Sequence, residues 1–241
     1  MPRMFTPTGA SCLIRPSSDP EPAGGSAQAL QQRLHSLRAA LPDGCRLLAV
    51  SKGQPADQIR AAVAAGQGSF AESRLQEATA KQAELADLAP LDWHFIGRLQ
   101  ANKVRPVLRH FATVHSLDSL ELARRMARIA AEETLSPAAF CQVKLRPDPA
   151  KTGFTPEALR ACWPELCALS PLRIIGLMTI APLGLDRPQR QALFADCAAL
   201  AKDLGLAELS MGMSDDWPEA AAAGSTWVRI GSGLFGARRH N

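Results

Sequence analysis

The chain has 241 residues, of which 46% are hydrophobic and 21% charged, as in ordinary soluble globular proteins. This excludes a disordered, collagen-like or disulfide-scaffold chain, and no apolar run approaches the roughly 18–20 residues of a membrane span. The net charge is +4, from 27 Lys and Arg against 23 Asp and Glu, without a dense basic run, so the sequence predicts no nucleic-acid partner.

The cysteines do not indicate a metal site. None forms a C-x-x-C pair, and the histidines do not complete a ligand cluster. Scattered cysteines in a chain of this size predict reduced, buried packing residues and a cytoplasmic location. The six are Cys12, Cys45, Cys141, Cys162, Cys167 and Cys197.

The first 25 residues are rich in Pro, Gly and Ser and show no periodicity, which predicts a flexible N-terminal arm. Arg3 and Arg15 suggest a transit peptide. However, Asp19 and Glu21 and the lack of an amphipathic arginine face favour a plain unstructured extension. We therefore expect one domain over residues 26–241.

From residue 26 onward, short apolar runs alternate with helical segments, and Asp118 is the expected N-cap of the helix that follows it. Strands alternating with helices indicate a parallel sheet, and eight strands in this length predict a closed (β/α)8 TIM barrel. An open doubly wound sheet is the alternative, although it usually has fewer strands. The expected order is helix 27–41, strand 46–51, helix 55–65, strand 66–70, helix 72–87, strand 92–96, helix 100–109, strand 111–115, helix 118–133, strand 139–145, helix 156–168, strand 172–178, helix 187–203, strand 208–211, helix 216–223 and strand 226–230.

Functional groups of such barrels lie at the carboxyl ends of the strands. Lys52 follows the apolar run LLAV at the end of the first strand. At an apolar barrel mouth its pKa would fall, and a neutral amine can form a Schiff base with an aldehyde. On this feature alone, a solvated lysine at a strand end is the more common explanation.

The last two strands end in segments suited to a phosphate. Ser214 precedes a helix, and Gly231 and Ser232 offer close backbone approach and a hydroxyl. Asp215 and Asp216 would have to point away from such an anion. Simple turns and a helix cap are the alternative explanation.

Three further residues are ambiguous from the sequence alone. Alternation places Arg229 and Trp227 on one face of the last strand but does not show whether that face points inward. Taken alone, His94 predicts a hydrogen-bonded core histidine, and Met178 a packing residue.

Together these segments resemble the YggS/PROSC family of pyridoxal phosphate (PLP) homeostasis proteins. The resemblance covers nearly all of the chain after the N-terminal arm, and the combination of segments is specific where no single one is. The matching segments are LLAVSK, WHFIGRLQANK, HSLDS, KTGF, GLMTIAP, LSMGMSDD and AGSTWVRIGSGLFGAR.

The resemblance implies a barrel of the alanine racemase N-terminal domain type that binds PLP. Lys52 matches the Schiff-base lysine and Arg229 the arginine that faces the pyridine nitrogen. An arginine does not readily give up its proton, so the ring nitrogen would stay unprotonated and be a poor electron sink. The cofactor-binding residues that the resemblance implies are Lys52, Ser73, His94, Met178, Ser214, Arg229, Gly231 and Ser232.

The sequence departs from the family pattern near the site. Ser73 stands where the family has Asn, and Arg74 where it has Tyr. Gly53 and Gln54 replace a Thr-Lys pair, and Lys144 replaces an Asn on the fifth strand. These changes put PLP affinity and exchange in question but leave the Schiff-base and phosphate positions intact.

We therefore expect a PLP-binding homeostasis protein that holds PLP as a lysine aldimine and has no catalytic residue of its own. PLP-dependent apo-enzymes are candidate partners, and a monomer is expected. One alternative is an enzyme with weak racemase or transaminase activity, but the chain has no tyrosine to act as a second base. Another is a PLP-independent Schiff-base aldolase.

Overall fold

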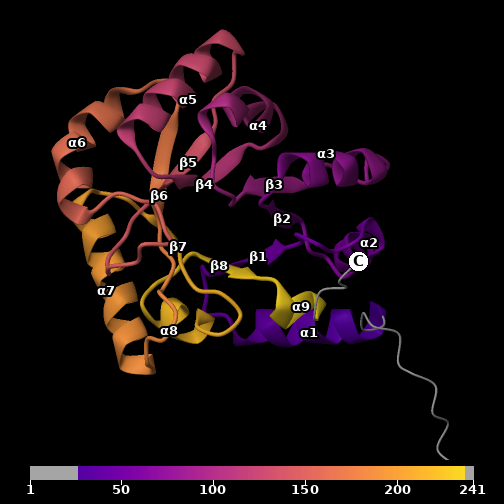
Figure 1. Ribbon diagram of the computed structural model, residues 1–241. Coiled ribbons are helices and arrows are strands. Elements are labelled where there is room, and N and C mark those ends of the chain that lie inside the picture. Colours follow the sequence, from indigo (N-terminus) through magenta and orange to yellow (C-terminus); the bar gives the residue numbers. More distant parts are fainter. Residues whose placement is uncertain (1–26, 237–241) are drawn as a thin grey trace, which may run out of the picture.

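The computed structural model of the protein describes residues 27–236, and Figure 1 shows helices arranged around a central sheet. Within these residues, eight strands pair in sequence order, each parallel to its neighbours, and β8 pairs with β1 to close the barrel. The predicted (β/α)8 fold is therefore confirmed. The strands are β1 (Arg46–Val50), β2 (Ser69–Glu72), β3 (Asp92–Phe95), β4 (Thr113–Leu117), β5 (Ala138–Gln142), β6 (Arg173–Met178), β7 (Glu208–Ser210) and β8 (Trp227–Ile230).

The helices cover the outside of the barrel, and a short helix after β8 lies beside the first helix in Figure 1. Arg33 Nε donates to Leu234 O across this contact at 2.6 Å. Leu30 and Leu34 are buried in the same apolar cluster as Ile230, so the first helix covers the seam between β8 and β1. The helices are α1 (Ala27–Ala40), α2 (Ala56–Ala64), α3 (Leu75–Glu84), η1 (Ala101–Lys103), α4 (Val104–His110), α5 (Leu120–Glu132), α6 (Pro156–Ala168), α7 (Arg187–Asp203), α8 (Trp217–Ala222) and α9 (Ser232–Phe235).

The cap of α5 corrects one prediction. Ser119 rather than Asp118 is the N-cap, because Ser119 has extended backbone angles and its Oγ accepts from Leu122 N at 3.3 Å. The helix carries an apolar stripe that includes the fully buried Met126, which turns one face onto the barrel.

The second strand also differs from the prediction. It covers Ser69–Glu72 instead of residues 66–70, because Gly66 has φ +89° and turns the chain after α2. Gln67 then donates to Leu47 O at 2.9 Å and Ser69 O at 2.7 Å. The segment that follows residue 70 is polar, so its composition did not indicate that Glu72 belongs to the strand.

The last strand, β8, turns the side chains of Arg229 and Trp227 toward the barrel interior. Arg229 is 5% exposed and lies inside with Trp227, on the side of the apolar cluster that contains Phe140 and Met178. The cysteines are less uniform than expected: Cys141 and Cys197 are buried, two others are half-buried and Cys167 is exposed. Cys12 and the predicted N-terminal arm lie outside the described residues.

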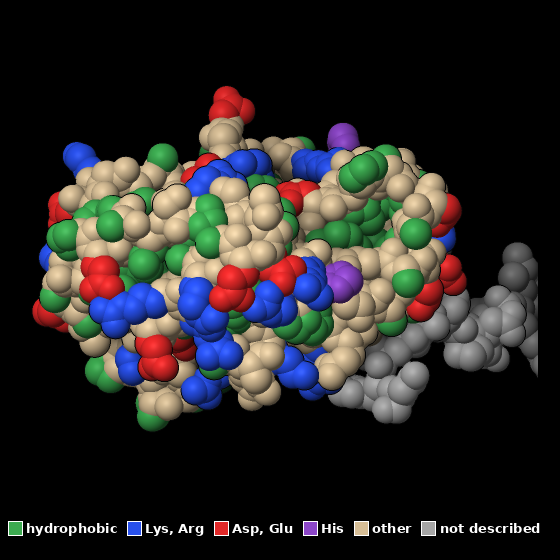
Figure 2. All heavy atoms as spheres, turned by 90° about the horizontal axis from the view of Figure 1, so that it is seen from above, with side chains coloured by type: hydrophobic (Ala, Val, Ile, Leu, Met, Phe, Trp, Pro, Cys, Tyr) green, Lys and Arg blue, Asp and Glu red, His purple; other side chains and the backbone are tan. Residues whose placement is uncertain are grey.

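The surface carries both signs of charge. On the face shown in Figure 2, Lys and Arg side chains are interspersed with Asp and Glu. Several are paired, for example Arg105 with Glu132 and Arg124 with Glu165. None of the helices within residues 27–236 is long and apolar enough to cross a bilayer, and the same residues hold no cluster of metal-ligating side chains.

Candidate functional site

A cavity of about 390 Å³ lies at the carboxyl ends of the strands. The end of β1, the end of β6 and the loops after β7 and β8 supply most of its wall, as the barrel geometry predicts. Six of the eight predicted cofactor-binding residues line it, while Ser73 and His94 do not. The lining residues are Val50, Lys52, Gln54, Ile96, Lys151, Met178, Ile180, Met213, Ser214, Asp215, Arg229, Gly231 and Ser232.

Two serines and a backbone amide form a small polar cradle on one wall of this cavity. Ser214 Oγ accepts from Gly233 N at 3.2 Å, and Ser232 Oγ donates to Ser214 Oγ at 3.2 Å. A Cβ on Gly233 would stand 3.1 Å from Ile230 Cγ2 and 3.5 Å from Ser214 Oγ, so a side chain would fill this space. Hydroxyls and an amide around an open space suit the oxygens of a phosphate.

The two aspartates of this loop differ. Asp216 is 6% exposed, does not line the cavity, and accepts from Met213 N at 2.6 Å. It therefore satisfies the requirement to point away from an anion. Asp215 lines the cavity wall.

Arg229 brings a fixed positive charge to the cavity. Nη1 donates to Ser210 O at 2.5 Å and to Ser210 Oγ at 2.8 Å, and Nη2 donates to Thr179 O at 2.9 Å. Burial lowers the pKa of Arg229 to about 10, with the nearby Asp216 opposing the shift, so the group stays charged at neutral pH.

A buried network that the sequence did not reveal holds the backbone on both sides of Lys52. Lys81 Nζ donates to Ser51 O at 2.7 Å and to Glu72 Oε1 at 2.8 Å. Gly53 N donates to Glu77 Oε1, which also accepts from Lys81 Nζ at 2.6 Å. The i,i+4 spacing of Glu77 and Lys81 was visible in the sequence, but their contact with the end of β1 depends on how α3 packs.

The carboxylates of this network differ in pKa. Burial raises the pKa of Glu72, and hydrogen bonds from Lys81 and Ser51 only partly offset this. Glu72 Oε2 is buried and has no hydrogen-bond partner within residues 27–236. Burial also acts on Glu77, but the bonds from Lys81 and Gly53 outweigh it and lower the pKa.

The two predicted residues outside the cavity have other surroundings. The carbonyl of Ser73 lies where a Cβ on Gly97 would be, only 2.1 Å from it, so the loop packs backbone to backbone there. His94 is 2% exposed inside the barrel, with Nδ1 2.8 Å from His115 Nε2 and Nε2 2.6 Å from Asp92 Oδ2.

Several residues of the cavity wall have no role that was predicted from the sequence. Ile96, Ile180 and Met213 add apolar surface, and Gln54 and Lys151 add polar groups. They lie at the ends of predicted strands or in the loops that follow them, which is a weaker signal than a motif.

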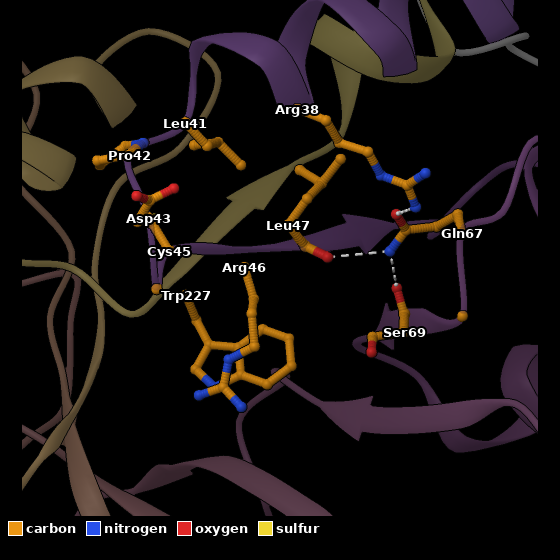
Figure 3. A pocket seen from close by; sticks show the side chains of 12 residues that line it. Arg38, Leu41, Pro42, Asp43, Cys45, Arg46, Leu47, Gln67, Ser69 and Trp227 are labelled. Atoms are coloured by element: carbon orange, nitrogen blue, oxygen red, sulfur yellow. Dashed lines mark hydrogen bonds between the residues drawn. The ribbon is translucent and has the colours of Figure 1, made fainter.

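A second cavity, of about 420 Å³, lies at the opposite end of the barrel (Figure 3). There the Arg46 guanidinium lies 4.0 Å from the centre of the Trp227 ring and pairs with Glu208, and Arg38 donates to Gln67 Oε1. The residues that line this cavity include no lysine, so it offers no amine beside a pair of hydroxyls. Most of the residues that were predicted from the sequence to bind a cofactor line the cavity at the other end.

Comparison with known proteins defines the family. The sequence model for the alanine racemase N-terminal domain matches residues 26–239. A pyridoxal phosphate homeostasis protein of Synechocystis sp. is 48% identical over 206 residues, which cover 83% of this chain and 94% of the relative. The chain belongs to this family. Its resemblance to the YggS/PROSC proteins is thereby confirmed.

Other members of the family and solved structures support this assignment. A pyridoxal phosphate homeostasis protein of Pseudomonas aeruginosa is 49% identical over 195 residues, covering 80% of this chain and 84% of the relative. PipY of Synechococcus elongatus with PLP bound has a TM-score of 0.83 and 52% identity, covering 86% of this chain and all of that one. An alanine racemase of Clostridium difficile, with a TM-score of 0.68 at 16% identity over 89% of this chain and 58% of its own, shares the fold.

Proposed function

We propose that the protein binds PLP as a Schiff base on Lys52 and acts in PLP homeostasis, without robust catalysis. The observation that carries this is a single cavity that combines Lys52, the cradle of Ser214 and Ser232, and the Arg229 guanidinium. The family names and the PLP-bound relative support it.

The residues of the cavity fit the three polar parts of PLP. An amine is present for the aldehyde, hydroxyls and a backbone amide for the phosphate, and a guanidinium for the pyridine nitrogen. Gly233 carries no side chain beside Ser214 Oγ, so a phosphate oxygen can approach the backbone closely there. Bound PLP supplies a reactive aldehyde and an electron-accepting ring, and the protein limits both.

Arg229 determines what chemistry is disfavoured. Its guanidinium only donates hydrogen bonds, so the pyridine nitrogen opposite it must accept one and stay unprotonated. A neutral pyridine ring accepts electrons poorly, which disfavours carbanion chemistry. The chain also has no tyrosine to serve as a second acid or base. Holding and releasing PLP therefore suits this site better than amino-acid turnover.

The finer parts of the proposal concern partners and location. PLP-dependent apo-enzymes are proposed as acceptors, since a protein that holds PLP without using it needs a consumer. A monomeric state is also proposed, with the support that one chain supplies the amine, cradle and guanidinium of the cavity. A cytoplasmic location is proposed from the cysteines, which are free among the described residues.

Titration of the protein with PLP, followed by absorbance and by amino-acid turnover, tests the proposal. Wild type and Lys151→Ala are expected to show a new absorbance band from covalently bound PLP, and Lys52→Ala none. Lys151 is a matched control because it lines the same cavity. A band of equal strength in Lys52→Ala, or turnover at rates typical of PLP enzymes, would contradict the proposal.

A further inference from the structure

A row of polar side chains crosses the barrel interior from the PLP cavity to its opposite end. Ser210 Oγ accepts from Arg229 Nη1 at 2.8 Å and lies 2.8 Å from His115 Nδ1. His115 Nε2 lies 2.8 Å from His94 Nδ1, and His94 Nε2 lies 2.6 Å from Asp92 Oδ2. We call these five residues the polar row. It joins the guanidinium in the cavity to a carboxylate at the start of β3.

The hydrogen bonds of the polar row must all be donated in one direction. A guanidinium has no acceptor, so Ser210 Oγ accepts from it, and the serine proton is donated to His115 Nδ1. His115 then carries its own proton on Nε2 and donates to His94 Nδ1. His94 in turn carries its proton on Nε2 and donates to Asp92.

The opposite direction would leave a buried group unsatisfied. Arg229 and His115 would both donate to Ser210 Oγ, and the serine proton would have no acceptor among the contacts of the described residues. Ser210 is fully buried, where an unpaired donor is costly.

The surroundings of His115 favour its neutral form, and ring contacts fix the orientation of both rings. Burial lowers the pKa of His115 well below its usual value, and the charge of Arg229 acts in the same direction. The His115 ring stacks on Phe140 with centroids 4.3 Å apart, and the His94 ring lies 5.0 Å from that of Trp227.

The far end of the polar row reaches solvent. The Asp92 side chain is 46% exposed and also accepts from Ser69 Oγ at 3.1 Å, beside the second cavity. Burial opposes ionisation of Asp92, but the hydrogen bonds from His94 and Ser69 and the nearby Arg46 charge together outweigh it, so the pKa is lowered. An ionised carboxylate is a strong acceptor at the end of the row.

We propose that the polar row beyond Arg229 is a positioning device, which holds the guanidinium in place for the cofactor by hydrogen bonds that all run toward Asp92. The inference rests on the proposed function, in which Arg229 faces the pyridine nitrogen of PLP. It assigns a role to four residues that lie outside the cavity wall, and it makes PLP retention depend on a carboxylate at the opposite end of the barrel.

The proton positions can be measured without PLP. Two-bond proton–nitrogen NMR of the full chain labelled with 15N-histidine reports which ring nitrogen carries the proton, and His94→Gln and His115→Gln assign the signals. Both buried rings are expected to carry a proton on Nε2 and to accept a hydrogen bond at Nδ1. In Ser210→Ala, His115 Nδ1 loses its donor while Nε2 still donates to His94, so the proton is expected to stay on Nε2 and the 15N shift of Nδ1 to move to that of a nitrogen without a hydrogen bond. Protonation of either ring at Nδ1 in the wild type would overturn the proposal.

PLP titrations then test the consequence for binding. Asp92→Leu and Ser210→Ala are expected to raise the dissociation constant of PLP about tenfold, the effect of one lost buried hydrogen bond. Asp92→Asn keeps an oxygen acceptor and is expected to stay within about threefold of wild type. Asp43→Leu removes an exposed carboxylate at the same barrel end, outside the row, and serves as the matched control.

Failure of this inference is distinct from failure of the proposed function. If Lys52 forms no adduct with PLP, the function is wrong, while the NMR result still reports on the row. If the adduct forms but Asp92→Leu binds PLP as Asp43→Leu does, or the 15N shift of His115 Nδ1 is unchanged in Ser210→Ala, the row is packing only and the inference is refuted.

Discussion

Replacing Lys81 by Met should strongly destabilise the protein, because this lysine neutralises a buried carboxylate. Its side chain is 8% exposed and that of Glu72 is 0% exposed, and Nζ makes three hydrogen bonds of 2.6–2.8 Å. Removing one partner of a buried pair costs about 3–5 kcal/mol. At about 2–4 °C per kcal/mol for a domain of this size, the Tm should fall by roughly 6–20 °C.

Urea unfolding of a double-mutant cycle checks this magnitude. Glu72→Gln in the Lys81→Met background removes the stranded charge, so the double variant should be more stable than the sum of the single changes predicts. Arg128→Met is the matched control, because Arg128 and Glu132 form an exposed i,i+4 pair whose loss should cost at most about 0.5 kcal/mol. A cost of Lys81→Met no larger than that of the control, or strictly additive variants, would refute the reasoning.

Three further predictions concern packing, thiols and pH. Gly176→Ala should abolish or severely impair folding, because a Cβ would lie 2.1 Å from Glu208 O. In the control Gly68→Ala, the new Cβ meets nothing within 4 Å, so the Tm should stay nearly unchanged. Equal Tm values for the two variants would contradict this. In the native protein a thiol reagent should modify the exposed Cys167 rapidly and the buried Cys197 only on unfolding. The reason is that burial shields Cys197 and raises its pKa to about 12. Equal labelling rates of the two cysteines, resolved by peptide mass, would contradict the burial of Cys197. Asp92 has a lowered folded-state pKa, so its contribution to stability is present above its unfolded pKa of about 3.9 and is lost as the pH falls through the folded value. The free energy of unfolding should therefore fall less steeply from pH 5 to pH 2 in Asp92→Asn than in wild type, and parallel curves would argue against the His94 contact.

The sequence predicted the barrel because its signal is local and repeated. Each strand is a short apolar run, and each is followed by a segment with helical periodicity, so errors at one boundary do not change the count. The same logic placed Lys52, Ser214 and Ser232 at one end of the barrel, since the carboxyl ends of parallel strands meet there.

What the sequence did not predict depends on contacts between distant segments. The inward orientation of Arg229 rests on bonds to Thr179 and Ser210, which lie 50 and 19 residues away. The pairing of Lys81 with Ser51 bridges 30 residues. A search for apolar patterns also misses polar groups inside a barrel. His115 was therefore noticed only as part of a segment that matches the family. Ser73 is the opposite case, because the family match predicted a cofactor contact but Ser73 does not line the cavity.

The central claim is that Lys52 holds PLP in the cavity at the carboxyl ends of the strands. Borohydride reduction after incubation with PLP, followed by peptide mass mapping, tests this directly, because reduction converts a Schiff base into a stable amine. We predict a pyridoxyl adduct concentrated on Lys52 at one equivalent of PLP. Absence of an adduct, or adducts spread evenly over exposed lysines, would contradict the claim.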